Sequence, residues 1–114
     1  MYPRLVTSED LVAERALAGD VLARRALVAH VYAPLAEAGP ELLDTLTALL
    51  DQGGSIEGTA RVLFVHPNTV RYRLRRVLDL TGLAPNDARH GFTLRIAMVL
   101  GRLASQDGSG QVDL

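Results

Sequence analysis

Apolar residues recur along this chain every three to four positions, as in amphipathic helices, and no segment alternates as strictly as a half-buried strand does. A weak stripe follows a capping sequence at residues 7–10, and two dense stripes come after it. Pro34 predicts a kink or an end in the helix of the first dense stripe. We interpret the leucine-rich second dense stripe as core, with a dimer contact as the alternative. The three stripes are Leu11, Ala13 and Leu17; Leu27, Val28, Val31, Tyr32 and Leu35; and Leu42, Leu43, Leu46, Leu49 and Leu50.

Two helices joined by a short turn are predicted between residues 55 and 82. Ser55 suits an N-cap, and the first helix must end near Leu63, because His66-Pro67 restarts the helical period only three residues later. The second helix should run from 66 to about 81, with Gly82 as its left-handed C-terminal residue. Phe64 occupies a turn position where glycine is common. The turn therefore either carries strain of about 1–3 kcal/mol or follows another path.

A last helix is predicted after Asp87, which can cap its start. Its expected core face is Phe92, Ile96, Val99, Leu100 and Leu103. Tyr32 is likewise expected in the core. Residues 105–114 hold little to bury, so we expect a disordered tail there.

The uneven distribution of charge along the chain adds a prediction about function. The formal net charge is −1, yet residues 58–78 hold five arginines and no acidic residue, whereas residues 1–57 hold four arginines against nine acids. On a helical wheel, Val70, Leu74, Val77 and Leu78 share one arc of the second helix, and its arginines lie on the opposite side. Neighbouring guanidinium groups at this spacing repel each other. The pattern predicts a rigid cationic helix that meets a polyanion, and a helix-turn-helix that binds double-stranded DNA.

The residue types suggest two roles at such an interface. Side chains early on the second helix would reach base edges in the major groove: Asn68 pairs well with adenine, and Arg71 or Arg75 with guanine. Thr69 or Tyr72 would contact a thymine methyl group or a phosphate. The backbone set comprises the helix start at Ser55 together with Arg61, Arg73 and Arg76. We interpret His66 mainly as an N-cap or turn residue, with base contact as the alternative.

Other classes of function find little support. The chain has no cysteine, and its three histidines, His30, His66 and His90, do not have metal-ligand spacing, so no metal or cofactor is expected. No phosphate-binding loop or catalytic triad context is present, so an enzyme is not predicted. No apolar run approaches the ~20 residues that span a bilayer, and no leader opens the chain, which favours a cytoplasmic protein. An RNA-binding module and a helical protein-interaction module with a basic docking face remain alternatives.

The stretch GSIEGTARVLFVHPNTVRYRLRRVLDLTG resembles the C-terminal helix-turn-helix domain of PucR/CdaR-type bacterial transcription regulators. The resemblance covers about residues 40–103. It is strongest in the segment typical of that family, HxNTxxYRLxxI…TG. The matching residues here are His66, Asn68, Thr69, Tyr72, Arg73, Leu74, Val77, Thr81 and Gly82.

This resemblance implies an all-α, Fis-like/PucR-type bundle of about five helices without a wing, with a helical lead-in. Residues 1–39 would form that lead-in, a remnant of an upstream region or a dimerisation element. Within them, residues 13–39 resemble the helical lead-in of a subgroup associated with fatty-acid synthesis operons. Residues 40–104 would form the DNA-binding domain. The resemblance further implies a homodimer, and a small-molecule effector sensed only by an upstream region of a longer regulator.

Overall fold

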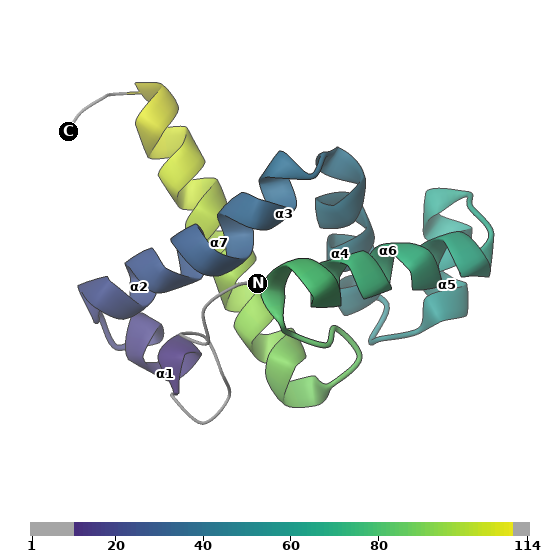
Figure 1. The fold of residues 1–114 in the computed structure, drawn as a ribbon, viewed down its shortest axis with the longest axis horizontal. Helices are drawn as coiled ribbons and strands as arrows, with labels where there is room; N and C mark the ends of the chain where they lie inside the picture. The colour runs from purple at the N-terminus through teal and green to yellow at the C-terminus, as the bar shows by residue number, and fades with distance from the viewer. Residues whose placement is uncertain (1–10, 111–114) are drawn as a thin grey trace.

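The computed structural model describes residues 11–110, and these residues form helices joined by short turns, with no strand among them. The prediction of an all-α fold is confirmed. Figure 1 shows α1 and α2 at one end of the molecule and α5 with the first turns of α6 at the other. The helices are α1 (Val12–Leu17), α2 (Val21–Leu27), a π-helical segment (Val28–Tyr32), α3 (Ala33–Glu37), α4 (Pro40–Asp51), α5 (Ile56–Leu63), α6 (Pro67–Thr81) and α7 (Ala88–Gly110).

The N-terminal helices show how Pro34 is accommodated. Asp20 caps α2 by accepting hydrogen bonds from the backbone N–H groups of Leu22 and Ala23, at 3.0 and 3.2 Å. The chain then stays helical through the π segment and α3, so Pro34 does not end the helix. Proline has no N–H to donate and its ring crowds the preceding turn, and the wider π turn just before it relieves that crowding. The predicted stripe keeps its phase, because Leu27, Val31 and Leu35 are fully buried.

The prediction of the buried face from the first, weak stripe was partly wrong. Leu11 and Leu17 are exposed, whereas Val12, Ala13 and Ala16 face the core, so the buried face of α1 is turned relative to the expected one. Small alanines let α1 lie close to α2 and α7, which it contacts. The expected cap at residues 7–10 lies outside the described residues.

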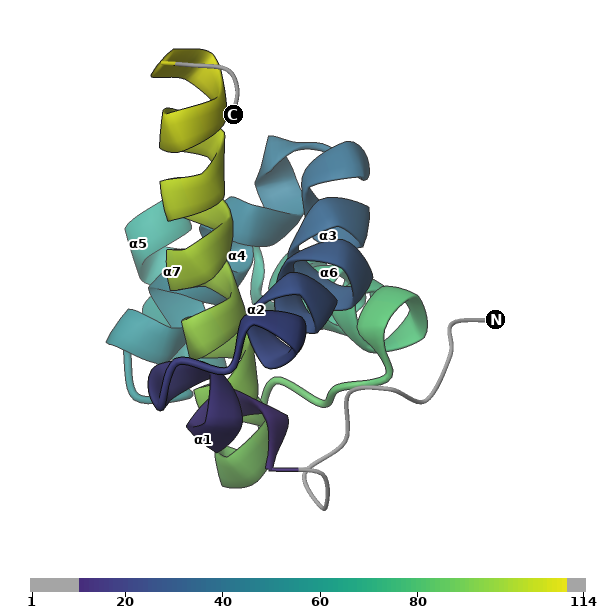
Figure 2. The ribbon, with the colours of Figure 1, turned by 90° about the vertical axis from the view of Figure 1, so that its left-hand side faces the viewer.

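The main core lies where α1, α2, the π segment, α3, α4, α6 and α7 meet. On α4, Leu42, Leu46 and Leu49 are buried, which confirms the interpretation of the leucine face as core. Figure 2 shows α7 running along one side of the molecule behind α1 and α2. A second, smaller cluster joins α4, α5 and α6: Leu49, Ala60, Val70 and Leu74, with Ile56 and Val65 against it.

The core face of α7 differs in part from the expected one: Ile96 and Leu100 pack against the core as expected, but the other three residues do not. Phe92 is 38% exposed, and Val99 and Leu103 also face outward. The buried residues instead include Leu94, Ala97, Met98 and Gly101. Gly101 lies against the ring of half-buried Tyr32 so closely that a Cβ there would overlap it. A long helix with many small and apolar residues offers two possible faces, and packing against α2 and the π segment selected this one.

Helix α7 also extends beyond the expected limit of the domain. It continues to Gly110, through residues expected to be disordered from 105 onward, and residues 111–114 lie outside the described part. Extending an existing helix fixes one residue per new hydrogen bond and avoids a new nucleation step, so the packed part of α7 can support exposed turns beyond it. No helix within residues 11–110 has the length and apolar character needed to cross a membrane.

Candidate nucleic-acid interface

Helix α5 starts and ends as the sequence predicted. The Oγ of Ser55 accepts a hydrogen bond from the N–H of Gly58 at 2.9 Å, and the carbonyl of Ser55 accepts one from the hydroxyl of Thr59 at 2.7 Å. The helix ends at Leu63, followed by Phe64 in the left-handed region, with φ 59° and ψ 44°. The turn therefore follows the path that glycine usually takes. A phenylalanine held in this conformation costs about 1–3 kcal/mol.

Close packing fixes the angle between α5 and α6. Ala60, on the inner side of α5, is buried against Val70 and Leu74 of α6 and Leu49 of α4. The N–H of Val65 reaches back to the carbonyl of Ala60 at 3.0 Å, which closes the end of α5. A side chain larger than alanine at position 60 would separate the two helices. The structure thus contains the predicted helix-turn-helix with a turn of residues 64–66.

His66 forms the N-cap of α6. Its Nδ1 accepts a hydrogen bond from the backbone N–H of Asn68 at 2.9 Å, which confirms the N-cap interpretation. Because Nδ1 acts as the acceptor, the proton of the neutral ring is carried by Nε2, which remains available as a donor. Pro67 occupies the first helical position, and Gly82 ends the helix with φ 76°, as predicted.

The outer face of α6 presents the residues expected to read bases. Asn68, Arg71, Tyr72 and Arg75 are exposed, with Tyr72 61% accessible, while Thr69 is half-buried. Nη1 of Arg71 donates a hydrogen bond to Oδ1 of Asn68 at 2.8 Å. The side chains of Asn68 and Arg71, which were predicted to contact different bases, are therefore hydrogen-bonded to each other in the free protein.

Arg73 differs from the other arginines of α6 because it is hydrogen-bonded to another helix. It is half-buried, and its Nη1 donates to the hydroxyl of Thr45 at 3.1 Å. Thr45 is fully buried on α4, so this bond ties α6 to the core. Beside it lies a hollow of about 250 Å³ lined by Ala38, Glu41, Leu42, Tyr72, Arg73 and Arg76.

Two site features were missed or misplaced by the sequence patterns. Thr45 could have been noticed as a polar residue within the leucine stripe of α4, on its buried side. Leu78 was expected on the buried arc of α6 but is 42% exposed, and Thr81 is buried instead. The Thr81 hydroxyl can be buried because it donates to the carbonyl of Val77 at 2.7 Å and accepts from the N–H of Leu83 at 3.1 Å.

Ion pairing differs between the arginines of this face and three arginines elsewhere on the surface. Ion pairs join Arg15 to Asp20, Arg89 to Glu14 and Arg95 to Asp51. Among the residues the structure describes, no carboxylate lies within 4.0 Å of the guanidinium groups of Arg61, Arg71, Arg75 or Arg76. Within residues 11–110, the guanidinium groups of these four arginines are thus not in ion pairs.

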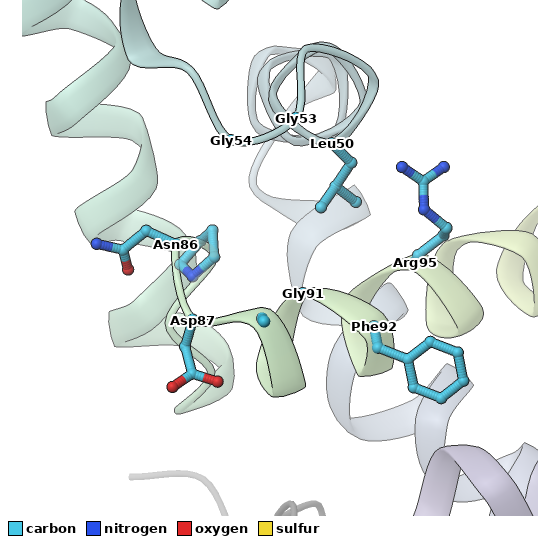
Figure 3. A pocket seen from close by; sticks show the side chains of 10 residues that line it. Leu50, Gly53, Gly54, Asn86, Asp87, Gly91, Phe92 and Arg95 are labelled. Atoms are coloured by element: carbon cyan, nitrogen blue, oxygen red, sulfur yellow. The ribbon is translucent and has the colours of Figure 1, made fainter.

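A separate hollow of about 320 Å³ lies between the turn at Gly53–Gly54 and the start of α7. Figure 3 shows Leu50 pointing across it toward Gly91, and Arg95 on its far rim.

Asp87, also on the edge of this hollow, caps α7 by accepting a hydrogen bond from the N–H of His90 at 3.0 Å, as predicted. That hydrogen bond, and secondarily the charge of the His90 ring, lower the pKa of the Asp87 carboxyl below its ordinary value. Within the described residues no group of three His, Cys, Asp or Glu side chains could hold a metal ion.

Comparison with known proteins points in one direction. The sequence model of the PucR C-terminal helix-turn-helix domain matches residues 42–100, just over half of the chain. Uncharacterized proteins of Mycobacterium tuberculosis and Mycobacterium bovis are 54% identical over 101 residues, which is 89% of this chain and 24% of theirs. The purine catabolism regulatory protein of Bacillus subtilis is 41% identical over 64 residues, covering 56% of this chain and 12% of that protein.

A solved structure agrees with these sequence matches. The regulator of polyketide synthase expression from Bifidobacterium adolescentis superposes with a TM-score of 0.80 at 40% identity, covering 91% of this chain and 44% of that one. The chain spans about a quarter of the length of its mycobacterial relatives. The matched family is a DNA-binding fold of transcription regulators and not an enzyme.

Proposed function

Because the chain belongs to the family of PucR C-terminal helix-turn-helix domains, we propose that it recognises a specific sequence of double-stranded DNA with α6 in the major groove. One observation carries this proposal: α6 holds exposed arginines that no carboxylate of the described residues neutralises. A helix with its side chains is about 10–12 Å across, which matches the ~12 Å width of the major groove. The packed crossing with α5 keeps α6 rigid in that orientation.

The base-reading set is Asn68, Thr69, Arg71, Tyr72 and Arg75. These residues lie between the start and just past the middle of α6, and the N-terminal part of a recognition helix is the part that contacts base edges. The hydrogen bond from Arg71 to Asn68 holds both side chains before DNA arrives. An arginine that reads guanine while it orients an asparagine reading the adjacent adenine would couple two base positions.

The backbone set remains Ser55, Arg61, Arg73 and Arg76, and we add His66 to it. Ser55 and His66 cap the starts of α5 and α6, where backbone N–H groups favour a phosphate. Nε2 of His66 is free to donate to a phosphate oxygen in the neutral ring. Arg73, tied to Thr45, would contact phosphate with its remaining donors and with little loss of side-chain freedom.

Further parts of this proposal concern the longer protein. Two copies of the chain would occupy half-sites about one helical turn apart, and an upstream region would sense a small-molecule effector. The protein would act in the cytoplasm. The Bacillus subtilis relative and the Bifidobacterium adolescentis structure are both regulators by name, which supports a role in transcription.

The test starts with selection of binding sites from a random double-stranded library by the 114-residue chain. Asn68→Ala and Arg75→Ala should each weaken binding to the selected site by about 1–3 kcal/mol and relax the preference at one base position. Arg61→Ala should weaken binding to all sequences alike and reduce the slope of log K against log salt by roughly 1. If all three variants behave alike across sequences, the division into base and backbone roles is wrong.

A competition experiment and a direct binding experiment address the alternatives. A structured RNA that displaces the selected duplex would favour an RNA-binding module. Absence of duplex binding even at low salt, with retention of an acidic protein, would favour a protein-docking role for the basic face.

A further inference from the structure

Phe64 combines two unfavourable properties at one position of the helix-turn-helix. Its side chain is 93% exposed, and its backbone lies in the left-handed region with φ 59°. A single exposed apolar residue needs no explanation by itself. Here, however, glycine or asparagine would relieve the backbone strain and remove the exposed ring together. A phenyl group kept under both conditions suggests that the ring makes a contact outside the chain.

The surroundings of Phe64 indicate the chemistry of that contact. The ring borders an open groove of about 640 Å³ between α5 and the start of α6, lined also by Glu57, Ala60, Arg61, Val65 and Pro67. Phe64, Val65 and Pro67 form an apolar part of its wall, and Arg61 adds an exposed cation. Glu57 is the acidic member, at the beginning of α5 and outside the acid-free stretch of residues 58–78. A ligand that alternates apolar groups with anions suits this wall.

The position of Phe64 in the chain places DNA within its reach. Asn68 lies four positions further along the chain, and four residues span at most about 14 Å. Successive nucleotides of one strand rise about 3.4 Å, so Phe64 lies within roughly five nucleotides of any base that Asn68 contacts. Phenylalanine contacts the thymine methyl group in the major groove, and deoxyribose offers similar C–H groups along the backbone.

We infer that Phe64 is a DNA-contact residue whose ring packs on apolar atoms at the groove edge, either a thymine methyl group or a deoxyribose, while Arg61 binds the adjoining phosphate. This inference rests on the proposed DNA recognition by α6. Phe64 adds affinity at the border of the site that Asn68, Arg71 and Arg75 read.

The test compares Phe64→Asn with Leu103→Asn in the 114-residue chain. Asparagine tolerates the left-handed conformation, so Phe64→Asn should keep or raise the melting temperature. Its affinity for the selected duplex should fall roughly 5- to 30-fold, the effect of partly burying one phenyl ring. Leu103, 53% exposed on α7, is the matched control, and its replacement should leave DNA affinity unchanged.

Two further measurements identify the apolar group. With deoxyuridine replacing each thymidine in turn, a thymine methyl contact predicts one position that weakens the wild type and not Phe64→Asn. A deoxyribose contact predicts no such position. It predicts instead that hydroxyl-radical cleavage increases in Phe64→Asn at a nucleotide within roughly five of the base read by Asn68.

The outcomes separate this inference from the function on which it rests. Equal affinity, deoxyuridine response and cleavage pattern for the wild type and Phe64→Asn would overturn it, as would loss of transcriptional output with unchanged DNA binding, which would assign the ring to a protein contact. If Asn68→Ala weakens binding and Phe64→Asn does not, only the role of Phe64 fails. If the wild type selects no duplex sequence, the proposed function fails as well.

Discussion

Helices α6 and α7 both carry arginines on exposed turns, and they differ in what these arginines contact. On α7, Arg89 pairs with Glu14 of α1 at 2.8 Å, Arg95 pairs with Asp51 of α4 at 3.8 Å, and Arg102 donates to Thr47 of α4 at 2.9 Å. On α6, Arg71 contacts only its own helix, through Asn68, in the bonds described. The arginines of α7 therefore link α7 to its neighbours, whereas those of α6, apart from Arg73 with its bond to Thr45 of α4, remain available to a ligand.

In the free protein, both arrangements change the free energy of unfolding only slightly. Exposed ion pairs such as those of α7 stabilise by about 0–1 kcal/mol each. Repulsion between like charges one helical turn apart costs about 0.2–0.5 kcal/mol per pair. On a polyanion the same unneutralised charges release counterions and gain much more. Substitutions on α6 should therefore change binding, and substitutions on α7 should change stability.

The largest expected effect comes from Arg71→Ala with Arg75→Ala. Losing two cations of the proposed base-reading set should lower affinity for the selected duplex roughly 100-fold or more, because each such contact contributes about 1–3 kcal/mol. The free energy of unfolding should stay constant or rise slightly as repulsion is removed. Fluorescence anisotropy titrations and urea denaturation measure the two quantities.

The matched control is Arg95→Ala with Arg102→Ala on α7. This pair should leave DNA affinity unchanged and lower stability by no more than about 1 kcal/mol, since both side chains are exposed. Equal losses of affinity in the two double variants would mean that general positive charge, and not the face of α6, attracts DNA.

Gly101→Ala should produce the largest loss of stability among the single changes considered. A Cβ at this position would overlap the ring of Tyr32, so α7 and the π segment would have to separate. We expect the free energy of unfolding to fall by about 1–3 kcal/mol, measured by urea denaturation. The folded fraction should bind DNA normally. Ser105→Ala, on an exposed turn of the same helix, should cause no loss, and an equal effect there would argue against the Tyr32 contact.

Thr45→Val tests the one arginine of α6 that resembles those of α7. Valine keeps the shape of threonine but removes the acceptor of Arg73, which should cost about 0.5–1.5 kcal/mol of stability. DNA affinity should also fall, by less than about tenfold, because Arg73 is then oriented less well. Thr47→Val, which removes the acceptor of Arg102, should leave affinity unchanged. If neither variant alters DNA binding, Arg73 serves only the fold.

Asp87→Asn should have the smallest effect, visible as a change in pH dependence. The pKa of Asp87 is lowered below its ordinary value of 3.8, so its stabilising contribution is complete above that pH and disappears as the pH falls through the folded-state value. Asparagine can also cap a helix but does not titrate in this range. Melting temperatures of the wild type and the variant should therefore converge at acidic pH. A constant difference between pH 7 and pH 2 would contradict this role.

The local features of the site could be predicted from the sequence because each depends on a few adjacent residues. Ser55 and His66 form caps, Gly82 ends α6, and residues 64–66 form the turn, all as expected. The buried face of α4 was also predicted, since its five leucines leave one apolar side. The sequence also showed that Phe64 stands where glycine is common, but only the backbone of the turn showed that Phe64 is in the left-handed region.

Errors arose where one segment offered several solutions of similar energy. Apolar and small residues occur on several sides of α7, so Phe92 became exposed, and Gly101 lies against Tyr32 where α7 packs on the π segment. Leu78 became exposed for a similar reason, because Thr81 could satisfy its hydroxyl locally and take the buried position.

The sequence by itself determined that the chain is helical, where the helix-turn-helix lies, and that the positive charge gathers on one helix, since periodicity, caps and charge are properties of neighbouring residues. Tertiary structure alone decided which arginines are tied to the protein and which are free to meet DNA. That choice depends on distances between side chains far apart in the chain, such as Arg73 and Thr45 or Arg95 and Asp51, and these distances are set only when the helices pack.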